Sequence, residues 1–294
     1  MIKMKEALVF GGSGFLGSHV ADKLSENKYN VTIIDIKKSK YLKENQKFIQ
    51  EDIKNLSTNS SLFKKCSYIF NFAGIADIDE SLRNPEKTIT NNILNNFKLL
   101  EITKKHNIKK YIFASSVYAG SNSGNYYSIS KNCSEDYIIL YSKLNSINYT
   151  ILRFGSLYGT RSGNKNGVYK FIQSALLKNK IEFSGSPESI REFINVEDAA
   201  LSTIDILKKE FDKKIITLTG HQLLKIKDLH QMIREILNKK KLKVSYKINK
   251  NNTHYRLTPY SIDQKISKKY SPKLYTDLGE GLLQLSKEIL YEKK

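Results

Sequence analysis

A glycine-rich turn near the N-terminus restricts this chain to few folds. Residues 11–17 read GGSGFLG, directly after the apolar run ALVF and at the start of a helical pattern over residues 15–27. Glycines spaced GxxGxxG between a strand and a helix are typical of a Rossmann fold. There the turn needs unusual dihedrals, the backbone approaches a pyrophosphate and the helix packs closely on the sheet. We therefore expect a dinucleotide on this turn, bound by Gly11, Ser13, Gly14, Phe15, Leu16 and Gly17.

Strand-like and helix-like segments alternate through the first half of the chain. Strands are expected at residues 7–10, 31–35, 48–49, 68–70, 110–114 and 149–154, with helices at 15–27, 85–107 and 127–145. This alternation predicts an α/β fold with a doubly wound parallel sheet. After residue 160 strand-like and helix-like segments no longer alternate regularly. We expect a Rossmann domain of residues 1–162 and 191–218, and a smaller C-terminal α/β substrate lobe of residues 163–190 and 219–294.

Composition excludes several classes of protein. The formal charge is +20, but only six of the 49 basic residues are Arg and the Lys residues are spread along the chain, so we expect no nucleic-acid partner. No apolar run approaches the roughly 20 residues of a membrane span, and the N-terminus lacks the pattern of a signal peptide. Cys66 and Cys133 are too few for a disulfide framework or a zinc cluster. We expect a soluble cytoplasmic protein without a metal site.

An acidic residue at the end of the second strand indicates which dinucleotide binds. Asp35 can accept hydrogen bonds from the ribose hydroxyls and would repel a 2′-phosphate, so NAD is favoured over NADP. Alternatively Asp35 only caps a loop, and the nearby Lys37 and Lys38 leave NADP open. The third and fourth strands are followed by further candidates for contact with the cofactor: Asp52, Ile53, Phe72, Ala73 and Gly74.

Tyr127 and Lys131 suggest alcohol chemistry. They lie four residues apart at the start of a helical pattern, so they share one helix face. A Lys ammonium there lowers the pKa of the phenol, which can then act as a base toward a substrate hydroxyl while hydride leaves for nicotinamide. Ser115 and Ser116 end the fifth strand at the same sheet edge, where a hydroxyl can hold the substrate oxygen. A Tyr–Lys pair at this spacing also occurs by chance, so the pair gains weight from the other motifs.

Several motifs in order resemble one known family. The strings FGGSGFLGSH, VTIIDI, NFAG, FASSVYAG, YYSISK, LRFGSLYGTR, REFINVEDAA and DLGEGL cover essentially the whole chain. Together they resemble the extended short-chain dehydrogenases/reductases of the NAD-dependent epimerase/dehydratase family. The resemblance implies a nucleotide-diphosphate sugar as substrate and a catalytic set of Ser116, Tyr127 and Lys131. It also implies a homodimer formed through residues 85–107 and 127–145.

The resemblance assigns further binding residues by motif match. Asn92 matches the active-site asparagine of the fourth helix. Ser115, Tyr127 and Lys131 are expected to touch the cofactor as well. The residues implied to bind the substrate are Ser116, Ser156, Tyr158, Arg161, Arg191 and Arg256. Arg191 matches the arginine that binds the diphosphate, because a planar guanidinium suits that group, although an edge-strand salt bridge is the alternative.

Departures from the family pattern reduce the number of possible reactions. No Asp-Glu pair follows Ser116, which argues against a 4,6-dehydratase, and Ala76 stands where UDP-galactose 4-epimerases carry a Lys. Other stretches resemble a branch linked to bacterial surface polysaccharides that includes heptose-nucleotide 4-dehydrogenases. We expect oxidation at C4 of the sugar by a 4-epimerase or a 4-dehydrogenase, with a 4-keto-sugar reductase as an alternative. A non-catalytic Rossmann protein that senses redox state or binds RNA is the alternative of another class.

Overall fold

A large parallel sheet forms the centre of the molecule. The structure is a computed structural model that describes residues 4–121, 123–247, 267–272 and 274–292. Eight strands pair in the order β13-β10-β6-β5-β4-β1-β2-β3, all in parallel. Their bounds are β1 Lys5–Phe10, β2 Tyr29–Asp35, β3 Gln46–Gln50, β4 Cys66–Asn71, β5 Lys110–Ser116, β6 Tyr149–Phe154, β10 Lys214–Leu218 and β13 Lys268–Tyr270. The expected doubly wound Rossmann sheet is confirmed.

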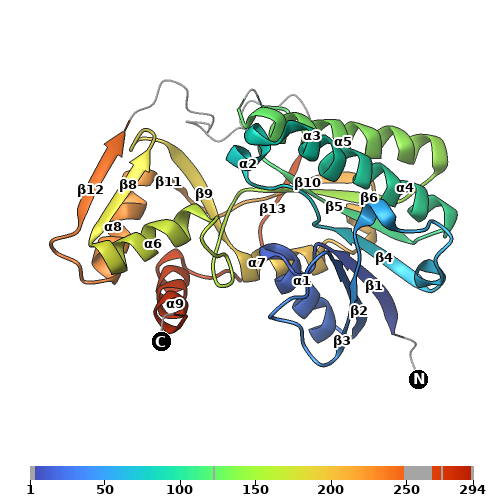
Figure 1. The fold of residues 1–294 in the computed structure, drawn as a ribbon, viewed down its shortest axis with the longest axis horizontal. Helices are drawn as coiled ribbons and strands as arrows, with labels where there is room; N and C mark the ends of the chain where they lie inside the picture. The colour runs from blue at the N-terminus through green and yellow to red at the C-terminus, as the bar shows by residue number, and fades with distance from the viewer. Residues whose placement is uncertain (1–3, 122, 248–266, 273, 293–294) are drawn as a thin grey trace.

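Helices cover both faces of this sheet (Figure 1). Helices α1 (Phe15–Glu26) and α7 (Val196–Asp205) pack on one face, and α4 (Asn95–Lys105) and α5 (Asn125–Asn145) on the other. The middle strands read as continuous apolar runs because both of their faces are buried. The strand order reverses between β1 and β4, so the crevice for a ligand opens at the carboxyl ends of these strands.

The long helical pattern over residues 85–107 is interrupted in the structure. It forms α3 (Pro85–Thr88), a π-helical segment (Ile89–Leu94) and α4, preceded by α2 (Ile78–Arg83). Periodicity alone does not reveal such a π-helical insertion, which often occurs at functional sites. Short 3₁₀ helices lie at Ile53–Asn55, Ser61–Phe63 and Lys209–Phe211. No helix among the described residues is long and apolar enough to span a bilayer.

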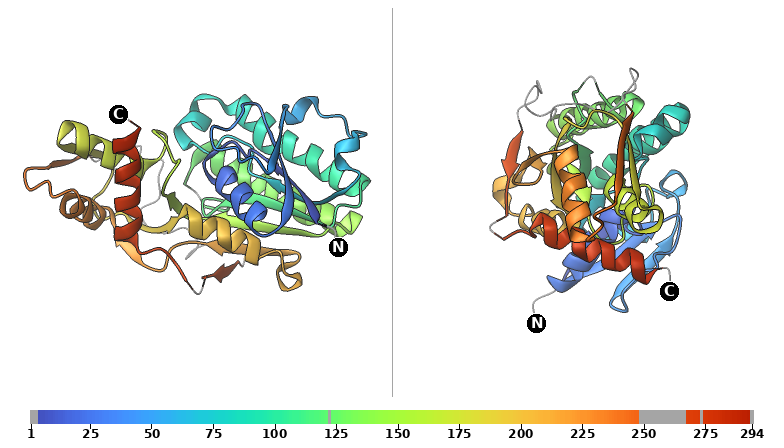
Figure 2. Two further views of the ribbon diagram at one scale, coloured as in Figure 1. Left: turned by 90° about the horizontal axis from the view of Figure 1, so that it is seen from below. Right: turned by 90° about the vertical axis from the view of Figure 1, so that its left-hand side faces the viewer.

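A smaller lobe lies beside the sheet domain (Figure 2). It contains α6 (Gly167–Lys178), α8 (Ile226–Ile236) and α9 (Leu278–Tyr291) around its own apolar core. Its strands are the parallel pair β8 (Lys180–Ser184) and β12 (Lys243–Lys247) and the small sheet β11-β9-β7, formed by Leu223–Lys225, Ile190–Asn195 and Ser156–Tyr158. The chain passes back and forth between the two parts. Strand β9 pairs in the small sheet, whereas β13, which comes later in the chain, pairs at the edge of the large sheet.

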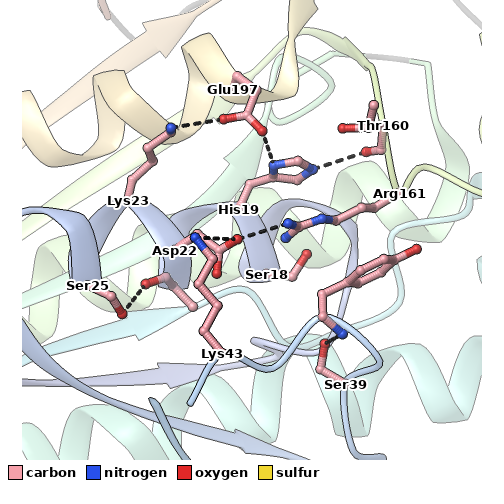
Figure 3. A network of polar contacts seen from close by, with 12 residues as sticks. Ser18, His19, Asp22, Lys23, Ser25, Ser39, Lys43, Thr160, Arg161 and Glu197 are labelled. Carbon is pink, nitrogen blue, oxygen red and sulfur yellow. Dashed lines mark hydrogen bonds and ion pairs between the residues drawn. The ribbon is translucent and has the colours of Figure 1, made fainter. Parts of the chain in front are cut away.

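A network of polar side chains connects the sheet domain to the lobe (Figure 3). We call it the joint network and define it by His19, Asp22, Lys23, Arg161 and Glu197. From α1, His19 contacts Glu197 Oε1 at 2.7 Å and the Thr160 carbonyl at 3.0 Å. Arg161 donates through Nη2 to Asp22 at 2.9 Å, and its backbone N–H donates to Glu288 of α9 at 2.8 Å. The loop that carries Arg161 is thereby bonded to both parts.

Candidate active site

Each glycine of the turn at residues 11–17 has a steric reason. Gly11 has φ +73°, and a Cβ there would lie 2.6 Å from the Ala73 nitrogen. A Cβ on Gly17 would lie 2.2 Å from the Gly11 carbonyl oxygen, so only glycine lets α1 begin so close to β1. The Ser13 hydroxyl is buried and has no hydrogen-bond partner among the described residues. A backbone cradle with an unused hydroxyl at a helix N-terminus fits a pyrophosphate.

Two cavities meet at this turn. The first, of about 570 Å³, is lined by Asp35, Asp52, Ile53, Phe72, Ala73 and Gly74. The second, of about 700 Å³, is lined by Phe15, Leu16, Gly17, Ser115, Ser116, Tyr127 and Lys131. They share Gly11, Gly14, Phe72 and Gly74, so together they form one trough over the carboxyl ends of the strands. A trough of this shape beside a helix N-terminus fits an extended ligand such as a dinucleotide.

Asp35 accepts hydrogen bonds from the backbone of its own loop and of the glycine turn. Its Oδ2 accepts the Ser13 N–H at 3.0 Å and its Oδ1 accepts the Lys37 N–H at 3.2 Å, so the carboxylate orders the turn. It also lines the first cavity. Asp52 caps the helix Ile53–Asn55 by accepting the Lys54 N–H at 3.0 Å and lines the same cavity.

Asn92 lies behind the cavity wall. The amide of Asn92 accepts the Ile75 N–H at 2.8 Å and donates to the Ile75 carbonyl at 3.1 Å and to Ser130 at 2.9 Å. It also lies so close to Gly74 (φ +145°) that a Cβ there would come within 2.6 Å of Asn92 Oδ1. Asn92 is not among the residues that line either cavity, and its hydrogen bonds shape the wall at Gly74 and Ile75.

The structure brings Ser116, Tyr127 and Lys131 together at the second cavity. Tyr127 is hydrogen-bonded to Ser116. Lys131 Nζ donates to the Ala114 carbonyl at 2.8 Å and lies 5.9 Å from the centre of the Tyr127 ring. Serine, phenol and ammonium groups therefore converge where a substrate oxygen can bind.

Burial is the main cause of the pKa shifts of Lys131 and Tyr127. It lowers the pKa of Lys131 to about 8, while the charge of Glu135 acts in the opposite direction. Burial raises the pKa of Tyr127, and the hydrogen bond with Ser116 partly offsets it. The sequence-based expectation of a lowered phenol pKa therefore does not hold in this arrangement, because desolvation of the phenolate outweighs the other effects.

The residues implied to bind substrate are distributed over different places. Ser156 and Arg161 line the second cavity, but the Arg161 guanidinium binds Asp22 and lies over the Tyr41 ring at 4.6 Å. Tyr158 is buried in the lobe core and is not among the residues that line the second cavity, whereas its neighbours Ser156 and Leu157 line it. Thus the structure commits Arg161 to the joint network and places Tyr158 away from the second cavity.

Of the two remaining arginines, Arg191 is within the part of the chain that the structure describes. Arg191 is buried on β9, where its Nη1 donates to the Ile190 carbonyl at 2.8 Å, and it lines neither of the two cavities. Arg256 lies outside the described residues.

Several residues at the cavity have no signal in the sequence. Tyr118 lines the second cavity, and its ring centre lies 6.3 Å from that of Tyr127. Glu80 of α2 lines both cavities and forms an ion pair of 2.6 Å with Lys165, across the opening from the lobe side. Because these two residues are 85 positions apart, only the folded chain brings them together.

Comparison with known proteins agrees with this geometry. Residues 7–217 match the model of the NAD dependent epimerase/dehydratase family. A protein of Methanocaldococcus jannaschii, named as an inferred UDP-glucose 4-epimerase, is 30% identical over 77% of this chain and 81% of its own length. A UDP-glucuronate 4-epimerase of Thermodesulfobacterium geofontis is 27% identical over 79% of this chain and 81% of its own length.

Solved structures share the fold over nearly the whole chain. A UDP-N-acetylglucosamine 4-epimerase from Methanobrevibacter ruminantium has a TM-score of 0.85 and 25% identity, over 99% of this chain and 100% of that one. A UDP-glucuronic acid 4-epimerase from Bacillus cereus, solved with UDP-glucuronic acid and NAD, has a TM-score of 0.83 and 24% identity, over 98% and 99%. Since the family model matches well over half of it, the chain belongs to the NAD-dependent epimerase/dehydratase family and is an NAD-using enzyme of the extended short-chain dehydrogenase/reductase type.

Proposed function

We propose that this enzyme oxidises the C4 hydroxyl of a UDP-linked sugar and acts as a 4-epimerase. The observation that carries the proposal is the convergence of Ser116, Tyr127 and Lys131 on a cavity that continues into the glycine-turn cavity. The relatives named above act on UDP-sugars at C4, which supports the same substrate class here. A heptose-linked substrate and a place in surface-polysaccharide synthesis in the cytoplasm rest on motif resemblance alone.

The chain's own residues divide the proton chemistry among them. When bound, NAD supplies the hydride acceptor. Ser116 holds the substrate oxygen by hydrogen bonding, and Tyr127, which is bonded to Ser116, takes the hydroxyl proton when it is in its phenolate form. Lys131 stabilises the phenolate by its charge when it is protonated. The trough of the two cavities orients the sugar toward the half that receives hydride.

Product analysis separates the possible reactions. A panel of UDP-, GDP-, CDP- and dTDP-linked hexoses and heptoses is incubated with the enzyme and followed by NMR and by NADH absorbance. A C4 epimer without net NADH supports the 4-epimerase, whereas a 4-keto product with stoichiometric NADH means a 4-dehydrogenase. Reduction of a 4-keto sugar alone would mean a reductase. Salt-sensitive RNA binding without any turnover would contradict an enzymatic role.

The catalytic assignment is tested by Tyr127→Phe. This variant keeps the ring and loses the hydroxyl, so we expect NAD binding to persist and kcat to fall by about 100-fold or more. Turnover at the wild-type rate would contradict the role of Tyr127.

We propose that Arg191 and Arg256 bind the diphosphate of the substrate, as the motif match implies. Arg191→Lys keeps the charge and loses the planar fork. We expect it to raise KM for the nucleotide sugar and to leave NAD affinity unchanged. An unchanged KM would contradict the assignment of Arg191.

We also propose a homodimer through α4 and α5. These helices expose large apolar side chains, and the Phe97 and Tyr137 rings meet edge to face with centres 5.9 Å apart. Such a patch on two adjacent helices suits a second copy of the same surface. Phe97→Lys with Tyr137→Lys is expected to give a monomer in light scattering after gel filtration. Leu290→Lys, at an exposed apolar site of α9, is the control that keeps the dimer.

A further inference from the structure

The last three residues of β5 are each bonded to one face of α5. Ser116 bonds Tyr127, the Ala114 carbonyl accepts Lys131 at 2.8 Å, and Ser115 Oγ donates to Glu135 Oε1 at 2.5 Å. Tyr127, Lys131 and Glu135 follow one another at intervals of four residues, so they form one stripe along the helix. Glu135 is the third member of a stripe whose first two members are the proposed catalytic pair.

A second strand reaches the same carboxylate. Arg153 of β6 donates through Nε to Glu135 Oε1 at 2.9 Å and through Nη2 to Oε2 at 2.7 Å. Both side chains are almost completely buried, at 1% and 0% exposure. The Arg153 guanidinium therefore bonds α5 to β6, and Ser115 bonds α5 to β5. Both bonds lie directly beside the residues that line the second cavity.

Stability alone does not explain this pair. Taking two charges out of water costs about as much as their attraction returns, and packed apolar residues of similar size stabilise a protein equally well or better. The two charges have another explanation: Glu135 lies on the same helix face as the proposed catalytic residues Tyr127 and Lys131. Resting on the proposed catalytic role of Tyr127 and Lys131, we propose that Glu135 and Arg153 are positioning residues: they hold α5 in register with β5 and keep Lys131 cationic beside Tyr127.

The charges around Lys131 give the direction of the effect. Glu135 lies one turn along the same helix, Arg153 reaches Glu135 from β6, and Tyr127 lies one turn in the other direction. Burial lowers the pKa of Lys131 to about 8, and the negative charge of Glu135 raises it. Removing that charge makes Lys131 lose its proton at a lower pH, so activity at alkaline pH falls earlier.

Glu135→Gln tests the proposal, because the amide keeps the shape and loses the charge. We expect kcat for UDP-sugar epimerisation to fall by about tenfold to 100-fold, as for a misplaced catalytic group. KM is expected to stay within about threefold, since the binding contacts remain. The alkaline limb of the pH profile should shift to lower pH, and Glu135→Asp should move it back toward the wild-type position. Asp136→Asn, which removes the neighbouring exposed charge of the same helix, is the matched control and should keep the wild-type profile.

For the Glu135→Gln variant, two outcomes overturn the proposal. One is a folded Glu135→Gln protein with the wild-type kcat and pH profile, and the other is a fall in kcat without any movement of the profile. If Glu135→Gln does not fold, the apolar double variant Glu135→Leu/Arg153→Met is measured instead, and wild-type turnover in it overturns the proposal. Failure of both to fold also overturns it, because the pair would then serve the fold. Tyr127→Phe serves as reference: if it is active, the proposed function itself fails, independently of Glu135.

Discussion

The pair Glu135–Arg153 and the joint network use the same residue types in opposite surroundings. The pair is sealed, with side-chain exposures of 0% and 1%. In the joint network Glu197 is 42% exposed and Lys23 25%, whereas His19 and Asp22 are buried, at 1% and 7%. A sealed ion pair has one geometry, because breaking it leaves a buried charge. A half-exposed network can exchange partners with water, so it suits a joint between two parts of a molecule, whereas the sealed pair suits a fixed register.

The largest effect is expected when the sealed pair loses one partner. Arg153→Met removes the guanidinium that neutralises the buried Glu135 carboxylate and leaves the Ser115 hydrogen bond, so we expect the free energy of unfolding to fall by about 3–5 kcal/mol in urea titrations. The double variant Glu135→Leu/Arg153→Met should recover most of that loss, because no lone charge remains. A single variant as stable as the wild type would remove the contrast between the two regions.

A smaller loss is expected at the joint. Arg161→Met removes the bond to Asp22, but Asp22 keeps Gln46 at 2.9 Å and Lys43 at 3.4 Å, and Arg161 is 19% exposed. We expect a loss of about 1 kcal/mol in the same titration. A loss as large as that of Arg153→Met would show that the joint is as rigid as the sealed pair.

The joint is also expected to depend on pH. The hydrogen bond and charge of His19 hold the pKa of Glu197 down at about 2, against burial. Because the folded pKa lies below the ordinary value of 4.5, this stabilisation is complete above about pH 4.5 and is lost as the pH falls toward 2. The difference in Tm between wild type and Glu197→Gln should therefore shrink on acidification. A constant difference from pH 7 to pH 3 would contradict the assignment.

The smallest effect is expected at the ion pair across the cavity opening. Lys165 is 70% exposed and Glu80 26%. Lys165→Ala should change the free energy of unfolding by less than about 1 kcal/mol, and 0.5 M salt should remove the difference. A larger change in the free energy of unfolding that persists in salt would show that Glu80–Lys165 behaves like the buried pair Glu135–Arg153.

Local chemistry explains what the sequence predicts well. Some features depend only on residues that are close in sequence. The turn follows from Gly11, Gly14 and Gly17, the sheet from its apolar strands, and the shared helix face from the spacing of Tyr127 and Lys131, so all three were predictable. The place of Asp35 follows from the end of one strand. These features need no knowledge of distant parts of the chain.

Long-range partners explain what the sequence did not predict. Arg161 was expected at the sugar, and its bond to Asp22, 139 residues away in the chain, was not expected. Glu135 and Arg153 stand in ordinary helix and strand patterns, and nothing local indicates that they meet in the core. The π-helical segment at Ile89–Leu94 keeps the apolar spacing of a regular helix, so periodicity does not reveal it.

The edge of the large sheet has a consequence for synthesis of the chain. Strand β10 pairs on one side with β6 and on the other with β13, whose residues 268–270 are made more than 45 residues later. During translation the sheet therefore exists for a time with an open, apolar edge at β10, and such edges bind other strands. Completion of the sheet waits until β13 has left the ribosome, and until then the exposed edge at β10 is open to pairing with other strands.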